Sequence, residues 1–186
     1  MSLFSYKWWI FIAIFLFGAG LIFGFVSPTG IIGLPAEDMA AFEELSQFLA
    51  SLPLALIVLL IFIKNASVLL ISFVLSPMFC LVPILALTVN GWVIAFVSAT
   101  VIQEESLGYL LAGLLPHGIF ELPAFILGEA AALSFGAMAI VALFRRDRRN
   151  LLLPNLKRNF KYLMIALALL LPAAIIETFV TPLLLT

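Results

Sequence analysis

The sequence predicts an all-α integral membrane protein with about five transmembrane helices, a re-entrant half-helix and a short interfacial helix. Two observations carry this fold class. The chain is 65% hydrophobic and only 10% charged, an apolar share far above that of soluble domains. Apolar runs of about 20 residues, the length that crosses a bilayer, recur along almost the whole chain. Little length remains for a soluble domain, so we expect a single transmembrane domain over residues 1–186.

The first span is predicted over residues 8–26, where an apolar run follows Lys7 and is too long for the core of a signal peptide. Several prolines and glycines then interrupt the chain. The following stretch, "EDMAAFEELSQFLA", places apolar residues at helical spacing and its acids largely on other faces. This pattern is typical of an amphipathic helix lying at the membrane interface, and we expect one over residues 37–49.

The next apolar stretch is long enough for two spans, over residues 52–75 and 78–100, joined by a tight turn near Ser76-Pro77. Residues 107–115 are also apolar but would extend only about 14 Å as a helix, which is too short to cross. We therefore expect a re-entrant half-helix over residues 107–118 that turns at Pro116-His117-Gly118. Such a turn is tolerated at membrane depth only where protein or a wet cavity covers it.

The last two spans are predicted over residues 119–144 and 162–183, and a strongly basic loop over residues 145–161 separates them. This loop carries seven Lys or Arg residues against one acid, so the positive-inside rule makes it cytoplasmic. With five spans, the N-terminus is then cytoplasmic and the C-terminus outside the cell membrane. Leucines between the charges favour contact with anionic lipid headgroups at 145–161. We expect no nucleic-acid partner.

Ionisable residues inside spans are informative because a charge at mid-bilayer costs a few kcal/mol unless it is paired or wet. Counting helix rise from the outer end of each span brings Lys64, Asn90 and Glu129 together near the midplane, with Asn65 beside them. A pair of Lys64 with Glu129 either fixes the helix register or lines a transport pathway. Asn90 and Gly91 suit interhelical hydrogen bonding and close backbone approach.

His117 is the only histidine of the chain, and Glu121 follows it by one helical turn. The count of helix rise places both near the outer end of the fourth span, with Glu177 nearby and Glu104 and Glu105 above them. Three interpretations stay open: a hydrogen-bonded clasp, a divalent metal ion held by His117, Glu121 and Glu177, or proton and substrate handling. No HExxH motif is present, so we expect no enzyme; an intramembrane metal-dependent hydrolase is a distant alternative.

Four short elements, in chain order, are "KNA" at 64–66, "NG" at 90–91, "PHGIFELPA" at 116–124 and "IETFVTP" at 176–182. Together they resemble the stage II sporulation protein M family of polytopic membrane proteins. The resemblance implies a membrane protein that, in spore-forming bacteria, holds a cell-wall-degrading complex at the septal membrane. The family's characteristic positions would correspond to Lys64, Asn65, Asn90, Gly91, Pro116, His117, Gly118, Glu121, Glu177 and Pro182.

Two functions from different classes remain. The first is a membrane scaffold or assembly factor that recruits membrane or cell-envelope proteins through residues 37–49 or 145–161. The second is a transporter or channel for a small solute or ion, in which the broken helix at 107–118 supplies a dipole end. A homodimer is predicted from the small residues of the first span, where helices can pack closely. These small residues are Gly18, Ala19, Gly20 and Gly24.

Overall fold

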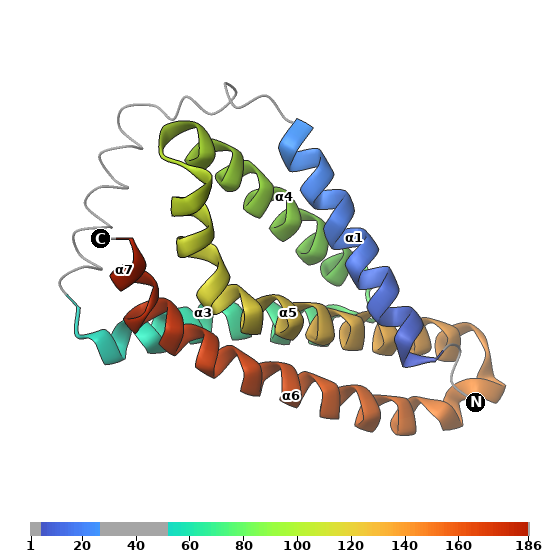
Figure 1. Ribbon diagram of the computed structural model, residues 1–186. Coiled ribbons are helices and arrows are strands. Elements are labelled where there is room, and N and C mark those ends of the chain that lie inside the picture. The colour runs from blue at the N-terminus through green and yellow to red at the C-terminus, as the bar shows by residue number, and fades with distance from the viewer. Residues whose placement is uncertain (1–4, 27–51, 186) are drawn as a thin grey trace, which may run out of the picture.

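The computed structural model describes residues 5–26 and 52–185, and every regular element in these two ranges is a helix (Figure 1). In chain order the elements are α1 (Tyr6–Val26), α3 (Leu54–Leu75), α4 (Leu81–Glu104), α5 (Leu107–Phe144), the 3-10 helix η1 (Arg146–Leu151), α6 (Leu152–Phe179) and α7 (Thr181–Leu184). Five helices in these ranges are long and apolar enough to cross a membrane. The prediction of an all-α multi-pass membrane protein is therefore confirmed. The interfacial helix expected over 37–49 lies outside the described residues.

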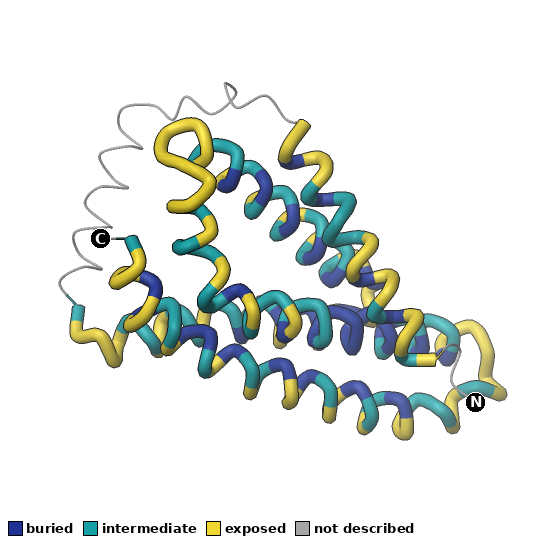
Figure 2. The backbone as a smooth tube through the Cα atoms, in the orientation of Figure 1, coloured by how far each residue is buried: buried dark blue, intermediate teal, exposed yellow. Residues whose placement is uncertain are grey.

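The helices form two groups that meet at α5. One group is α1 packed along α4, and the other is α3, the long second arm of α5, and α6, which lie side by side (Figure 1). The long arm of α5 contains more buried positions than any other helix, while outward faces of the other helices are exposed (Figure 2). Many of these exposed side chains are large and apolar, as a surface that faces lipid requires. α5 is thus the central helix of the domain.

The re-entrant half-helix expected over 107–118 is wrong, because α5 runs unbroken through this segment and no separate helix begins at residue 119. Its 38 residues correspond to about 57 Å of helix, well beyond the ~30 Å of a bilayer core. The helix accommodates this length by bending between a short first arm and a long second arm (Figure 1). Pro116 and Pro123 lie inside the helix, and each lacks the N–H that would bond one turn back, a usual cause of such bends.

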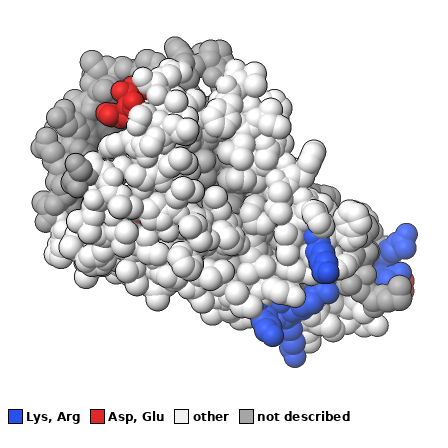
Figure 3. Space-filling model, in the orientation of Figure 1, with Lys and Arg blue, Asp and Glu red and all other residues white. Residues whose placement is uncertain are grey.

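The segment 145–161 is also more regular than the expected loop. It forms η1 and the first turns of α6, because its apolar residues and two asparagines recur at helical spacing. Asn155 and Asn159 are buried, and Asn159 Nδ2 donates to the backbone and side-chain oxygens of Asn155 at 2.9 and 2.8 Å. Lys and Arg side chains gather at this end, whereas acidic side chains lie at the opposite end (Figure 3). We call these the basic end, at η1, and the acidic end, at Glu104 and Glu105.

Glycines bring the backbones of α1 and α4 into direct contact. A Cβ added to Gly24 would lie 2.5 Å from the Trp92 carbonyl oxygen and 2.6 Å from Ala95 Cβ, both on α4. Gly20 and, from the other side, Gly91 meet the facing backbone in the same way. Gly20 and Gly24, two of the small residues proposed for a homodimer, therefore pack within the chain itself against α4, whereas a Cβ at Gly18 would meet nothing within 4 Å. A homodimer stays a prediction without an assigned face.

Candidate functional site

Three residues of the predicted outer cluster lie close together in the structure. His117 and Glu121 lie one turn apart on the same face of α5, and Glu177 comes from the last turns of α6. One possible ligand atom from each of the three residues lies within 4.8 Å of the others. His117 Nε2 is 3.9 Å from a carboxylate oxygen of Glu121, and these side chains are 12% and 29% exposed. The unbroken course of α5 through Gly118 is what places the two side chains together.

A hydroxyl that the sequence analysis missed orients the histidine ring. Thr181, the first residue of α7, lies 3.4 Å from His117 Nδ1 and donates to the Ile176 carbonyl at 3.4 Å. Because a hydroxyl has one proton, Thr181 accepts a hydrogen bond from Nδ1 in this arrangement. Nε2 of the neutral ring then carries a lone pair that faces the Glu121 carboxylate. Two acceptors in this position repel unless a proton or a cation lies between them.

The midplane pair of Lys64 with Glu129 is wrong. Lys64 on α3 interacts electrostatically with Glu121, and Glu129 lies instead beside Ser72. The count failed because it started the fourth span at residue 119, whereas α5 begins at Leu107 and bends before its long arm. Glu121 is consequently the residue of α5 at the depth of Lys64. Eight residues further along each helix, Glu129 and Ser72 meet in the same register.

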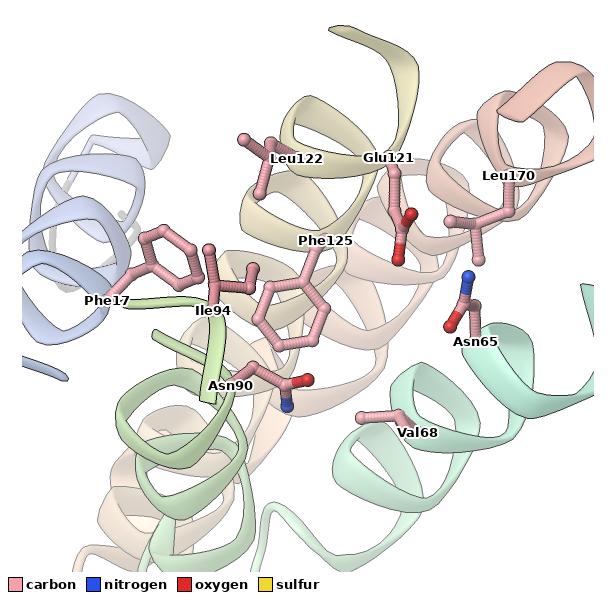
Figure 4. Close-up of a pocket in the computed structure, with 9 residues that line it drawn as sticks. All are labelled: Phe17, Asn65, Val68, Asn90, Ile94, Glu121, Leu122, Phe125 and Leu170. Atoms are coloured by element: carbon pink, nitrogen blue, oxygen red, sulfur yellow. The ribbon is translucent and has the colours of Figure 1, made fainter. Parts of the chain in front are cut away.

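Asn65 and Asn90, which were expected beside Glu129, lie instead near Glu121 of the outer cluster. Together with Glu121 and several apolar side chains they line a cavity of about 30 Å³, into which the three polar side chains are directed (Figure 4). Asn90 Nδ2 donates to the Ala86 carbonyl at 2.7 Å within its own helix, which leaves its oxygen for the cavity. A polar cavity of this volume is large enough for one or two water molecules. Polar groups therefore continue from the outer cluster of His117, Glu121 and Glu177 along the helices toward the middle of the membrane.

Comparison with known proteins places this arrangement in a family. The model of the family described as Stage II sporulation protein M matches residues 12–182, which include the cluster, the cavity, most of α1 and all of the other four spans. The chain belongs to the stage II sporulation protein M family. It is also 26% identical over 174 residues to an uncharacterized protein of Methanocaldococcus jannaschii, a match that covers 93% of each chain. No solved structure matches this chain.

In this member of the stage II sporulation protein M family, the remaining residues that the sequence singled out lie outside the cluster or inside helices. Glu104 and Glu105 are exposed at the acidic end, and the structure does not bring them into the cluster. Pro116 and Gly118 lie inside α5, where a Cβ on Gly118 would meet only Leu114 at 4.0 Å. Pro182 stands in the first turn of α7, where its missing N–H leaves no helical hydrogen bond unmade.

The donor set of the cluster suits a proton or a divalent cation. An imidazole nitrogen and carboxylate oxygens are both ligands that zinc takes in proteins, although its usual catalytic sets carry two or three His or Cys ligands rather than one histidine and two carboxylates. Donor atoms around one zinc ion are roughly 3.4 Å apart when bonds of about 2.1 Å point to the corners of a tetrahedron. The observed spread of up to 4.8 Å means that the side chains would have to move inward by more than 1 Å on binding. The second carboxylate of the set comes from another helix, so binding would also hold α5 and α6 together.

Proposed function

We propose that this protein is an integral membrane scaffold that holds a cell-wall-remodelling complex at the cell membrane. The observation that carries the proposal is the family match, because it extends over residues 12–182 and the described part of that range consists of membrane helices with short connections. In this role the protein would act by positioning partners in or beside the bilayer. The exposed face of α1 offers lateral contacts through Phe11, Phe15 and Phe23, which are 63%, 74% and 69% exposed.

The orientation belongs to the same proposal. The basic end lies in the cytoplasm by the positive-inside rule, so the acidic end and the His117 cluster lie on the outer side. Partners of the cell envelope would then meet the acidic end, and anionic lipid headgroups would meet η1 and the start of α6. Single cysteines placed at Arg146 and at Glu104 test this directly. A membrane-impermeant thiol reagent added to intact cells should label only the cysteine at 104.

The scaffold role is tested by expressing Glu121→Gln in cells that lack the native copy, with Glu104→Gln as a control that removes an exposed carboxylate. Two quantities are measured for each variant: the amount of folded protein in the membrane and the fraction of cell-wall hydrolase activity that sediments with membranes. For a scaffold, we expect the membrane-bound activity to follow the amount of folded protein. A Glu121→Gln protein that accumulates and melts as the wild type does, yet retains no hydrolase activity at the membrane, contradicts this role.

A second candidate is a transporter or channel for a cation, and the cluster with its adjoining polar cavity favours it. Helices interrupted by proline near intramembrane polar groups accompany substrate sites in transporters. α5 is continuous, but it carries Pro116 and Pro123 and its bend lies beside this cluster. Zinc would be bound by His117, Glu121 and Glu177, and it would act there as the transported ion or as a structural clamp. Lys64 on α3 also lies near enough to Glu121 to interact with it electrostatically, although the ion pairs found among the described residues do not include this pair.

Metal content and melting temperature of the purified protein distinguish the two candidates. Wild type, Glu121→Gln and Glu104→Gln are equilibrated with zinc, passed through a desalting column and analysed for bound metal. A stoichiometric metal in wild type and Glu104→Gln that is lost from a normally melting Glu121→Gln supports the cation site. Equal metal in all three rejects it. No metal in any variant, with a much lower melting temperature for Glu121→Gln, identifies the cluster as a structural clasp and favours the scaffold.

A further inference from the structure

We propose that Glu129 is an intramembrane proton-binding site that is reached from the bilayer along a groove between α3 and α4. Neither proposed function uses this residue. It lies on the long arm of α5, eight residues beyond Glu121 toward the basic end. Its place near the middle of the span makes a permanent charge there costly, by a few kcal/mol on insertion scales.

Glu129 is fully buried, and neither of its carboxyl oxygens has a hydrogen-bond partner. Ser72 on α3 is equally buried and lies beside the carboxyl, but its hydroxyl oxygen is not within hydrogen-bonding geometry either. The two groups are therefore neighbours whose bonding capacity is unused. Neither of the two ion pairs found among the described residues involves Glu129. A carboxyl without a countercharge in this setting is stable as the neutral acid.

Several polar groups on the helices packed against α5 form contacts at other positions, although Arg158 Nε and Asn159 Oδ1 of α6 are buried without a hydrogen-bond partner among the described residues. The Tyr6 hydroxyl of α1 donates to the Leu127 carbonyl, the Cys80 thiol before α4 contacts the Leu133 carbonyl, Arg158 of α6 bonds to Ser134, and Lys64 of α3 interacts with Glu121. The side chain that interacts with the Glu129 carboxyl is Ser72. Proton exchange at Glu129 must then pass this hydroxyl.

A groove of about 360 Å³ between α3 and α4 leads to Ser72 from the outer surface of the helices. Its walls are mostly apolar, as with Ile71 and Leu85, and Ser72 and Asn90 supply its polar atoms. Asn90 lines the water-sized cavity at Glu121 as well, so the groove and the cavity adjoin. In the exchange step the two side chains would first move into hydrogen-bonding distance. The Glu129 O–H bond then breaks, Ser72 accepts that proton and passes its own to a water molecule that enters by the groove, and the products are the Glu129 carboxylate and a hydronium ion.

The test uses N,N′-dicyclohexylcarbodiimide, an apolar reagent that adds across the O–H of protonated carboxylic acids. The full chain is reconstituted in vesicles, treated with this reagent or with a water-soluble carbodiimide, and mapped by peptide mass spectrometry. We expect the apolar reagent to modify Glu129, and the water-soluble one to modify Glu104 and Glu105 instead. Ala86→Phe, which fills the groove, should reduce the labelling of Glu129 severalfold, whereas Leu111→Phe on an exposed face of α5 should not.

The proposal is overturned if the apolar reagent modifies Glu121 or Glu177 but leaves Glu129 unmodified, because the reagent has then reached the membrane interior. Labelling of Glu129 that appears only after unfolding in detergent overturns it as well. Glu129 labelling that is unchanged in a folded Ala86→Phe protein refutes the groove as the route. Since these readings come from wild type and a groove variant, they do not require that any Glu129 variant folds. They are also independent of metal binding and of hydrolase anchoring.

Discussion

Replacing Gly24 by alanine should lower the free energy of unfolding, because the added methyl group forces α1 away from α4. The added Cβ would lie 2.5 Å from the Trp92 carbonyl oxygen and 2.6 Å from Ala95 Cβ, whereas ordinary contact begins near 3.4 Å. The helices would therefore have to separate by about 1 Å at this crossing. Backbone atoms provide one side of the contact, so no rotation of a flexible side chain can relieve it.

The magnitude follows from two opposing effects. Overpacking of a tight contact costs about 1–3 kcal/mol, while alanine favours a helix over glycine by about 1 kcal/mol. The net loss expected for Gly24→Ala is therefore at most about 2 kcal/mol, and the full overpacking cost shows in the difference from a control glycine that has room for a Cβ. Gly18 is the matched control, because a Cβ there meets nothing within 4 Å. Gly18→Ala should gain up to about 1 kcal/mol from helix propensity, since it carries no overpacking cost.

The assay is equilibrium unfolding of the full chain in mixed micelles with a rising fraction of denaturing detergent, followed by tryptophan fluorescence. The two variants should differ by about 2 kcal/mol, a factor of up to about 30 in the ratio of folded to unfolded protein. If Gly24→Ala proves as stable as Gly18→Ala, the close contact of α1 with α4 is absent in solution and the reasoning fails.

Three further predictions use the same unfolding assay. Tyr6→Phe removes the hydrogen bond to the Leu127 carbonyl, 2.9 Å long, and should cost about 1 kcal/mol; an unchanged midpoint would show that the bond does not form. Phe79→Gly relieves a left-handed residue with φ of 56° whose side chain is 66% exposed, so it should stabilise by about 1 kcal/mol, and a loss would contradict the strain. Arg149→Ala removes the guanidinium that bonds the Ala142 carbonyl at 3.2 Å and should cost about 0.5 kcal/mol, more at low salt than at high salt.

Hydropathy gave the number and approximate positions of the spans because the length of an apolar run is a local property of the sequence. The tight turn expected near Ser76-Pro77 is present, since α3 ends at Leu75 and α4 begins at Leu81. The course of α5 could not be predicted from the local sequence, because it depends on the helices packed around it. Proline and glycine at 116–118 would break a helix in water, but packed neighbours let a helix in a membrane continue and bend instead.

The candidate site was predictable to the extent that it depended on helix periodicity. His117 and Glu121 share a face because they are four residues apart, and Glu177 joins them because α6 runs antiparallel to α5. The deeper residues depended on where each helix enters the membrane, which the bend of α5 changed, so Glu129 was assigned to the wrong partner. Ser72 carries no sequence signal, since single hydroxyls in apolar segments are common. Thr181 lies within the IETFVTP element at 176–182, but only the structure shows that its hydroxyl meets His117.

The glycine contact between α1 and α4 also limits how the protein can change shape. Because the two backbones are in direct contact along this crossing, we expect α1 and α4 to move together as one body. α3, the long arm of α5, and α6 form the second body. Both the groove at Ser72 and the cavity at Asn90 lie where these bodies meet. Any rearrangement is therefore expected to open or close this seam, and water or lipid would gain or lose access to both glutamates together.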